Sequence, residues 1–138
     1  MERPRSRIPG YFLWLIGVYC AASLIHFTHN AEFVTDYPNL PAWITRTSVY
    51  GAWLAITAVG AAGLLILKLG LRLPGLLVIA GYAALGFAGL EHYWVAPVSA
   101  HTLAMNATIW FEVAAAAALM VATLALLIRP GRWGPQPG

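Results

Sequence analysis

Four long apolar stretches, separated by short polar or proline-containing segments, divide the chain. They cover about residues 11–30, 43–67, 75–95 and 100–128. A helix needs roughly 20 apolar residues to cross the hydrocarbon core of a bilayer, and each stretch reaches that length. A segment surrounded by lipid must satisfy its backbone hydrogen bonds internally, which favours helix throughout. The pattern therefore predicts four transmembrane helices.

Prolines mark the connections between these stretches. Pro38 and Pro41 follow the first stretch, Pro74 follows a short turn after the second, and Pro97 precedes the fourth. Proline removes a backbone donor and disfavours helix in the residue before it, so each marks a boundary. Ser99 is expected to cap the last helix. Because short connections make neighbouring helices antiparallel, we predict a single all-α domain, an integral membrane four-helix up-down-up-down bundle spanning residues 1–138.

Composition supports a lipid environment. Of the 138 residues, 60% are hydrophobic and 9% are charged, whereas soluble domains average about 45–50% apolar and about 25% charged residues. The net charge of +3 does not form the continuous basic stripe that phosphate contacts require, so no nucleic-acid partner is expected. The expected partner is the lipid bilayer, together with a lipophilic substrate, other membrane subunits or a second copy of the chain.

The basic residues predict an orientation. In a four-span arrangement seven of the eight fall on one side: Arg3, Arg5, Arg7, Lys68, Arg72, Arg129 and Arg132. The two opposite loops contain no Lys or Arg, although Arg46 lies just inside the second stretch. Lys and Arg are retained on the cytoplasmic side during insertion. We therefore expect both termini in the cytoplasm, in a bacterial inner membrane.

Histidine and carboxylate side chains gather toward the opposite side. The group contains all four histidines and four of the five acidic residues: His26, His29, His92, His101, Glu32, Asp36, Glu91 and Glu112. Ionisable groups inside a membrane are costly unless they are paired, which makes them candidates for function. Counting ~1.5 Å of rise per residue from the cytoplasmic ends places His26 and Glu112 roughly 6 Å inside the outer boundary, with Glu91 and His92 slightly shallower.

Helical spacing predicts which of these side chains share a face. His26 and His29 are separated by three residues, so they are neighbours on one helix. His101 and Glu112 fall along one stripe of the last helix. Glu91 and His92 are about 100° apart, so only one can point fully inward, and we favour His92. The predicted ligand set is His26, His29, His92, His101 and Glu112.

This set is compatible with several kinds of site. Imidazole and carboxylate ligands suit a transition metal, with iron, copper or zinc as candidates. Two histidines on different helices could instead ligate haem. Without a metal, His and Glu side chains would act as acid and base on a lipid-soluble substrate, with Glu112 and Glu91 as the catalytic candidates, or the site would bind a lipophilic ligand. A purely structural interpretation is that these groups mark a membrane interface.

We favour a metal- or haem-dependent membrane oxidoreductase that acts on a lipid-soluble substrate. Asn106 and Tyr50 are expected to help hold its cofactor. The alternatives are a metal-free acid/base isomerase, a lipophilic-ligand-binding protein and an accessory subunit of a larger membrane complex.

Overall fold

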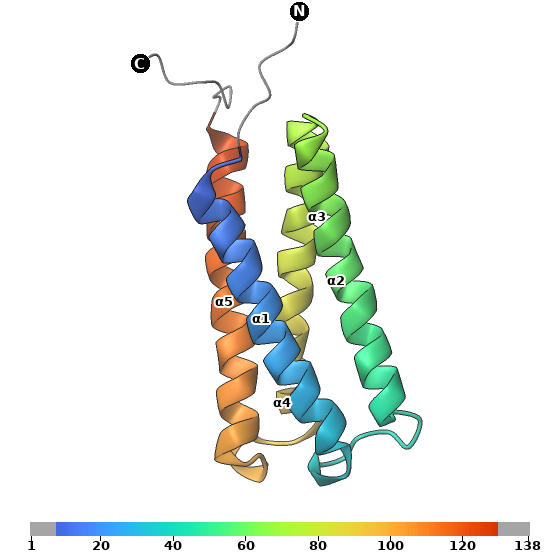
Figure 1. Ribbon diagram of the computed structural model, residues 1–138. Helices are drawn as coiled ribbons and strands as arrows, with labels where there is room; N and C mark the ends of the chain where they lie inside the picture. Colours follow the sequence, from blue (N-terminus) through green and yellow to red (C-terminus); the bar gives the residue numbers. More distant parts are fainter. Residues whose placement is uncertain (1–7, 130–138) are drawn as a thin grey trace, which may run out of the picture.

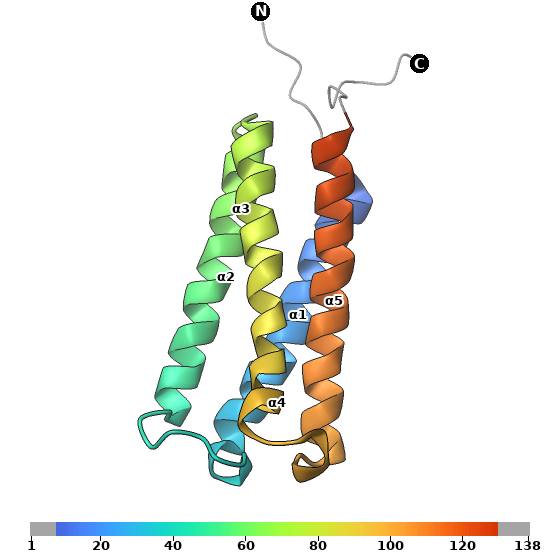
Figure 2. The same cartoon turned by 180° about the vertical axis from the view of Figure 1, so that it is seen from behind.

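The computed structural model describes residues 8–129 and is an all-helical bundle (Figures 1 and 2). Within these residues, four helical stretches are long and apolar enough to cross a membrane: Gly10–Glu32, Arg46–Lys68, Arg72–Val95 and Leu103–Ile128. The predicted all-α transmembrane four-helix fold is therefore confirmed. Part of the predicted basic cluster lies outside the described residues, namely Arg3, Arg5, Arg7 and Arg132.

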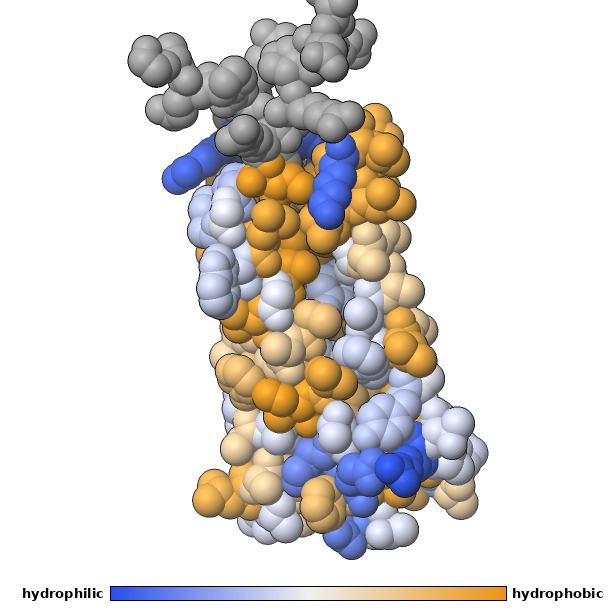
Figure 3. All heavy atoms as spheres, in the orientation of Figure 1, coloured by the Kyte–Doolittle hydropathy of each residue, from blue (hydrophilic) through white to orange (hydrophobic). Residues whose placement is uncertain are grey.

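The elements follow one another with short links. They are α1 (Gly10–Glu32), η1 (Val34–Asp36), α2 (Arg46–Lys68), α3 (Arg72–Leu85), η2 (Gly86–Glu91), α4 (His92–Val95), η3 (Val98–Ala100) and α5 (Leu103–Ile128). The start of α1, the α2–α3 turn and the end of α5 lie at one end of the bundle, which we call the basic end (Figure 1). The opposite end, formed by the 33–45 and 96–102 connections, is the histidine end. Figure 3 shows apolar side chains along most of the visible face and hydrophilic ones toward both ends.

Threonine side chains set the starts of α2 and α5. Thr45 accepts a hydrogen bond from the backbone amide of Ser48 and Thr102 from that of Met105, each as part of a reciprocal capping box. These bonds satisfy amides that the first turn of a helix leaves free. The predicted starts at residues 43 and 100 were therefore each three residues early, and Thr102, rather than Ser99, caps the last helix.

The apolar core fills the bundle toward the basic end. Here α1 packs mainly against α5 and α2 mainly against α3. The rings of Tyr19 and Tyr82, on α1 and α3, lie 4.6 Å apart at its centre. Toward the histidine end the buried side chains become polar, with Ser23, His26 and Glu112 each 2% exposed or less. The fold thus places a polar layer directly beyond an apolar core.

The third span changes from α-helix to a 3₁₀-helix at Gly86 and remains so to Glu91. Its two glycines face closely packed neighbours. A Cβ on Gly86 would lie 2.6 Å from the Ala116 Cβ and 2.7 Å from the Tyr19 ring, and one on Gly89 would lie 3.2 Å from His26 Cε1. A 3₁₀-helix turns about 120° per residue instead of 100°, which changes the directions of the side chains that follow.

Adding a methyl group at Gly86 should disturb this packing. We expect Gly86→Ala to lower the free energy of unfolding by about 1–3 kcal/mol, because the backbone must shift to admit the Cβ. Gly81→Ala, on α3, is a matched control because its Cβ would meet nothing within 4 Å. The Ala change there should be neutral or stabilising by up to about 1 kcal/mol. Thermal unfolding in detergent checks both variants, and equal midpoints would contradict the packing described here.

Candidate functional site

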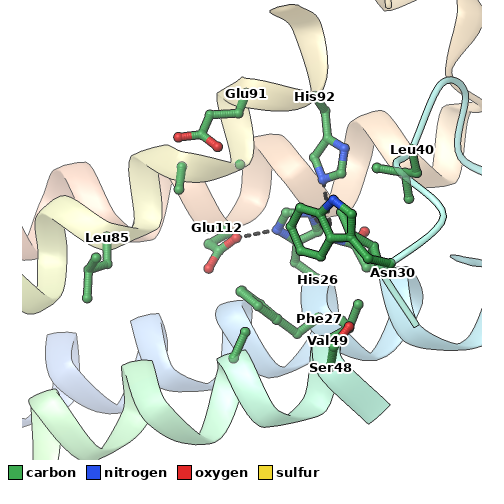
Figure 4. A pocket seen from close by; sticks show the side chains of 15 residues that line it. His26, Phe27, Asn30, Leu40, Ser48, Val49, Leu85, Glu91, His92 and Glu112 are labelled. Atoms are coloured by element: carbon green, nitrogen blue, oxygen red, sulfur yellow. Dashed lines mark hydrogen bonds and ion pairs between the residues drawn. The ribbon is translucent and has the colours of Figure 1, made fainter. Parts of the chain in front are cut away.

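A buried histidine and a buried carboxylate meet at the centre of the polar layer. His26 on α1 and Glu112 on α5 are each 2% exposed. His26 Nδ1 is hydrogen-bonded to Glu112 Oε2, as the dashed line in Figure 4 marks. The two side chains come from neighbouring helices, α1 and α5, that pack along the bundle. We call this interaction the His26–Glu112 pair.

Asn30 connects this pair to a second histidine. Its Nδ2 donates to His26 Nε2 at 3.0 Å and to His92 Nε2 at 3.3 Å. An imidazole nitrogen that accepts a hydrogen bond carries no proton, so neutral His26 carries its proton on Nδ1. His26 therefore donates through Nδ1 to Glu112.

The pair opens onto a pocket of about 330 Å³, within the size range of small-molecule sites. The pocket lies between α1, α2 and the α3–η2–α4 span. Its walls are mostly apolar: Phe27, Leu40, Trp43, Ile44, Val49, Ala52, Leu85, Ala88 and Gly89. The polar side chains are confined to His26, Asn30, Ser48, Glu91, His92 and Glu112. The pocket reaches the molecular surface, since Trp43 in its wall is 75% exposed.

Gly89 lets the pair face the pocket. A Cβ at this position would lie 3.2 Å from His26 Cε1 and 3.5 Å from Glu112 Oε2. A larger side chain would therefore stand between the pair and the pocket. Glycine at residue 89 keeps both groups accessible to a bound molecule.

A separate aromatic and histidine cluster lies nearer the histidine end. The buried Tyr37 ring is 5.0 Å from that of His92 and 6.4 Å from that of His101. Its hydroxyl is hydrogen-bonded to His29 Nδ1 at 2.9 Å. Burial raises the pKa of Tyr37 above its ordinary value, so the phenol remains neutral at physiological pH. His101 Nδ1 donates to the Pro97 carbonyl at 3.0 Å.

The predicted ligand set is only partly brought together. His26, His92 and Glu112 line the pocket, whereas His29 and His101 belong to the Tyr37 cluster. His101 precedes α5 and is not part of the predicted helical stripe with Glu112, because Thr102 starts that helix. Across residues 8–129, no group of three or more His, Cys, Asp or Glu side chains is arranged to hold a metal ion.

The other predicted site residues have different surroundings. Glu91 lines the pocket together with His92, although we expected only His92 to face inward. Asn106 accepts from the Tyr93 hydroxyl at 2.7 Å and donates to backbone carbonyls. Tyr50 donates to Glu32 at 2.7 Å. Asn106 and Tyr50 do not line the pocket.

Asn30 and Gly89 were not identified from the sequence, although both shape the site. Asn30 lies four residues after His26, a spacing that places both on one helix face and could have indicated a shared environment. Gly89 gave no such signal, because its role depends on how closely η2 approaches α1 and α5. The same close approach brings Glu91 and His92 to one pocket.

The sequence matches no protein family, and no curated protein or solved structure shows significant similarity to the chain. The chemistry of the pocket itself is well defined. It combines apolar walls with an imidazole that is hydrogen-bonded to a carboxylate, an arrangement suited to holding a small apolar molecule and to moving a proton.

Proposed function

We propose that the protein binds a lipid-soluble small molecule in the pocket and exchanges a proton with it through the His26–Glu112 pair. The observation that carries this proposal is the position of the pair at the end of an apolar-walled pocket, where Gly89 beside it leaves it accessible. The proposal makes the membrane the source of the ligand. An apolar molecule concentrates in lipid and can reach a pocket that opens on the surface of the bundle.

The cost of burying the pair supports a functional role. An ionised carboxylate inside a membrane costs several kcal/mol unless it is compensated, and a neutral histidine compensates it only in part. A purely structural core would be more stable with two apolar side chains of similar volume. Retaining Glu112 at 2% exposure therefore favours a role in chemistry or binding.

The pair also has the parts of a general base. His26 Nε2 can accept a proton, and the imidazolium formed is then stabilised by Glu112 through Nδ1–H. The proton can later return to the ligand or pass to water. A ligand that rearranges when a proton moves from one atom to another would be isomerised by the same steps, without an oxidant or a reductant.

Photolabelling tests the binding site directly. A small apolar aryl diazirine is added to the protein in phosphatidylcholine nanodiscs, irradiated, and mapped by mass spectrometry. We expect labelling to concentrate on pocket side chains such as Phe27, Val49 and Leu85, and excess unreactive analogue to suppress it. Labelling spread evenly over all lipid-facing side chains, with no competition, would contradict the proposal.

A metal site is a second candidate, favoured by one feature of the geometry. The Nε2 atoms of His26 and His92 both point at Asn30 Nδ2, at 3.0 and 3.3 Å. Glu112 is hydrogen-bonded to the other ring nitrogen of His26, as carboxylates commonly are to histidines that bind a metal. Iron, copper or zinc bound there would displace the Asn30 amide, and haem ligation would use the same two nitrogens.

Elemental analysis and an optical spectrum test this candidate in protein purified without chelator. Stoichiometric metal, or a haem spectrum, that is lost in His92→Ala would support it. Metal content below about one tenth of an equivalent, without a haem spectrum, would remove it.

For orientation, we infer a bacterial inner membrane location with both termini in the cytoplasm. The inference rests on the basic residues at one end, of which Lys68, Arg72 and Arg129 belong to the described residues. An alkaline phosphatase fusion after Asn39 should be active and one after Gly138 inactive, because the enzyme matures only outside the cytoplasm. The reverse pattern of activities would invert the orientation.

A further inference from the structure

We infer that the ligand of this pocket is an amphiphilic cation, a positively charged head on an apolar body. The inference rests on the proposed function, because it assigns the chemical class of the molecule that occupies the same pocket.

The charges that line the pocket are negative. Glu91 and Glu112 supply carboxylates, and no Lys or Arg lies among the lining residues of the described chain. Between residues 8 and 129 the ion pairs are His26–Glu112 and Arg46–Glu32. Glu91, an exposed side chain near the end of the third span, thus has no cationic partner there.

The hydrogen bonds at this end of the pocket also favour a cation, because they leave acceptor atoms rather than donors for a ligand. The Asn30 amide is a donor to His26 and His92, so both imidazoles present lone pairs through Nε2. The pocket end therefore holds two acceptor nitrogens and two carboxylates, and its one amide donor is already engaged. A neutral or anionic head group would leave the carboxylates uncompensated, whereas a cation would neutralise them.

The remainder of the pocket suits the rest of such a molecule. Its apolar walls can bury a hydrocarbon body, which contributes roughly 25 cal/mol per Å² of apolar area removed from water. Trp43, in the wall and 75% exposed, offers an indole face to a cation entering the pocket. The ligand class is therefore an ammonium or a similar cation attached to an alkyl or aryl group.

Calorimetric titration in phosphatidylcholine nanodiscs tests the inference. The probe is (4-butylphenyl)trimethylammonium, whose charge is permanent, and the comparators are neutral 1-butyl-4-tert-butylbenzene and anionic 4-butylbenzenesulfonate. We expect the cation to bind about tenfold or more tightly than either comparator.

Three variants locate the effect. Glu112→Gln and Glu91→Gln should each weaken cation binding several-fold, because each removes one carboxylate from the pocket. Asp36→Asn is the matched control, because it removes one negative charge from η1, outside the pocket. It should leave cation binding unchanged.

The possible outcomes separate this inference from the proposed function. If the neutral compound binds as tightly as the cation and binding depends on Glu112, the proposed function stands and the cation assignment is wrong. If no probe binds, both fail. Equal losses of cation affinity in Glu91→Gln and Asp36→Asn would also overturn the assignment, because they would indicate a general effect of surface charge.

Discussion

His26→Leu is expected to lower the free energy of unfolding by about 3 kcal/mol or more, the largest stability effect that we predict for a single substitution in the bundle. The change removes the hydrogen-bond donor of Glu112 and leaves the carboxylate facing apolar side chains. The carboxylate must then either remain charged without a partner or take up a proton, and both cost free energy. Unfolding titrations in mixed detergent micelles measure the loss.

A double-mutant cycle shows whether the loss belongs to the pair. Combining His26→Leu with Glu112→Leu should recover most of the stability, because apolar side chains replace both partners. His29→Leu is the control, since His29 lies one turn further along α1, is hydrogen-bonded to Tyr37 and forms no ion pair with the other described residues. His29→Leu should lower the free energy of unfolding by about 1 kcal/mol. A His26→Leu loss no larger than that of His29→Leu would mean that Glu112 is not compensated by His26.

Gly89→Val is expected to reduce ligand binding in the pocket by about tenfold or more, the largest binding effect of a substitution outside the pair. The new side chain would begin 3.2 Å from His26 Cε1 and would extend between the pair and the pocket. Photolabelling of Phe27 and Val49, and the affinity for the ammonium probe, should fall together.

Gly81→Val separates a steric block from the effect of a β-branched residue in a membrane helix. Gly81 is in the same span, and a Cβ there would meet nothing within 4 Å. This variant should bind the probes as the unmodified protein does. Unchanged binding in Gly89→Val would place the ligand away from Gly89 and the pair.

The four spans were predictable because the bilayer sets their length. About 20 apolar residues per crossing and the prolines between crossings located all four helices. Their starts were less predictable, because Ser99 and Thr102 both carry a hydroxyl that can cap a helix. Only the reciprocal contact between Thr102 and Met105 distinguishes the second position.

The site was predictable in depth but not in detail. Counting rise along each helix placed His26 and Glu112 in one layer, and the two side chains are hydrogen-bonded there. That Glu91 and His92 both line the pocket could not be derived from a helical wheel with 100° per residue, because η2 is a 3₁₀-helix. Its formation depends on contacts of Gly86 and Gly89 with α1 and α5, which no local pattern in the sequence specifies.

Infrared difference spectroscopy with and without a bound ligand tests most directly whether the pair exchanges a proton with the molecule in the pocket. The protein is held in nanodiscs and 4-butylbenzylamine, which can bind as amine or as ammonium, is added while labelling at Phe27 confirms occupancy. We predict that a carboxyl band changes on binding, that it shifts with ¹³C-labelled glutamate, and that it is missing from Glu112→Gln. A ligand that occupies the pocket without altering any band that depends on Glu112 would contradict the proposed function.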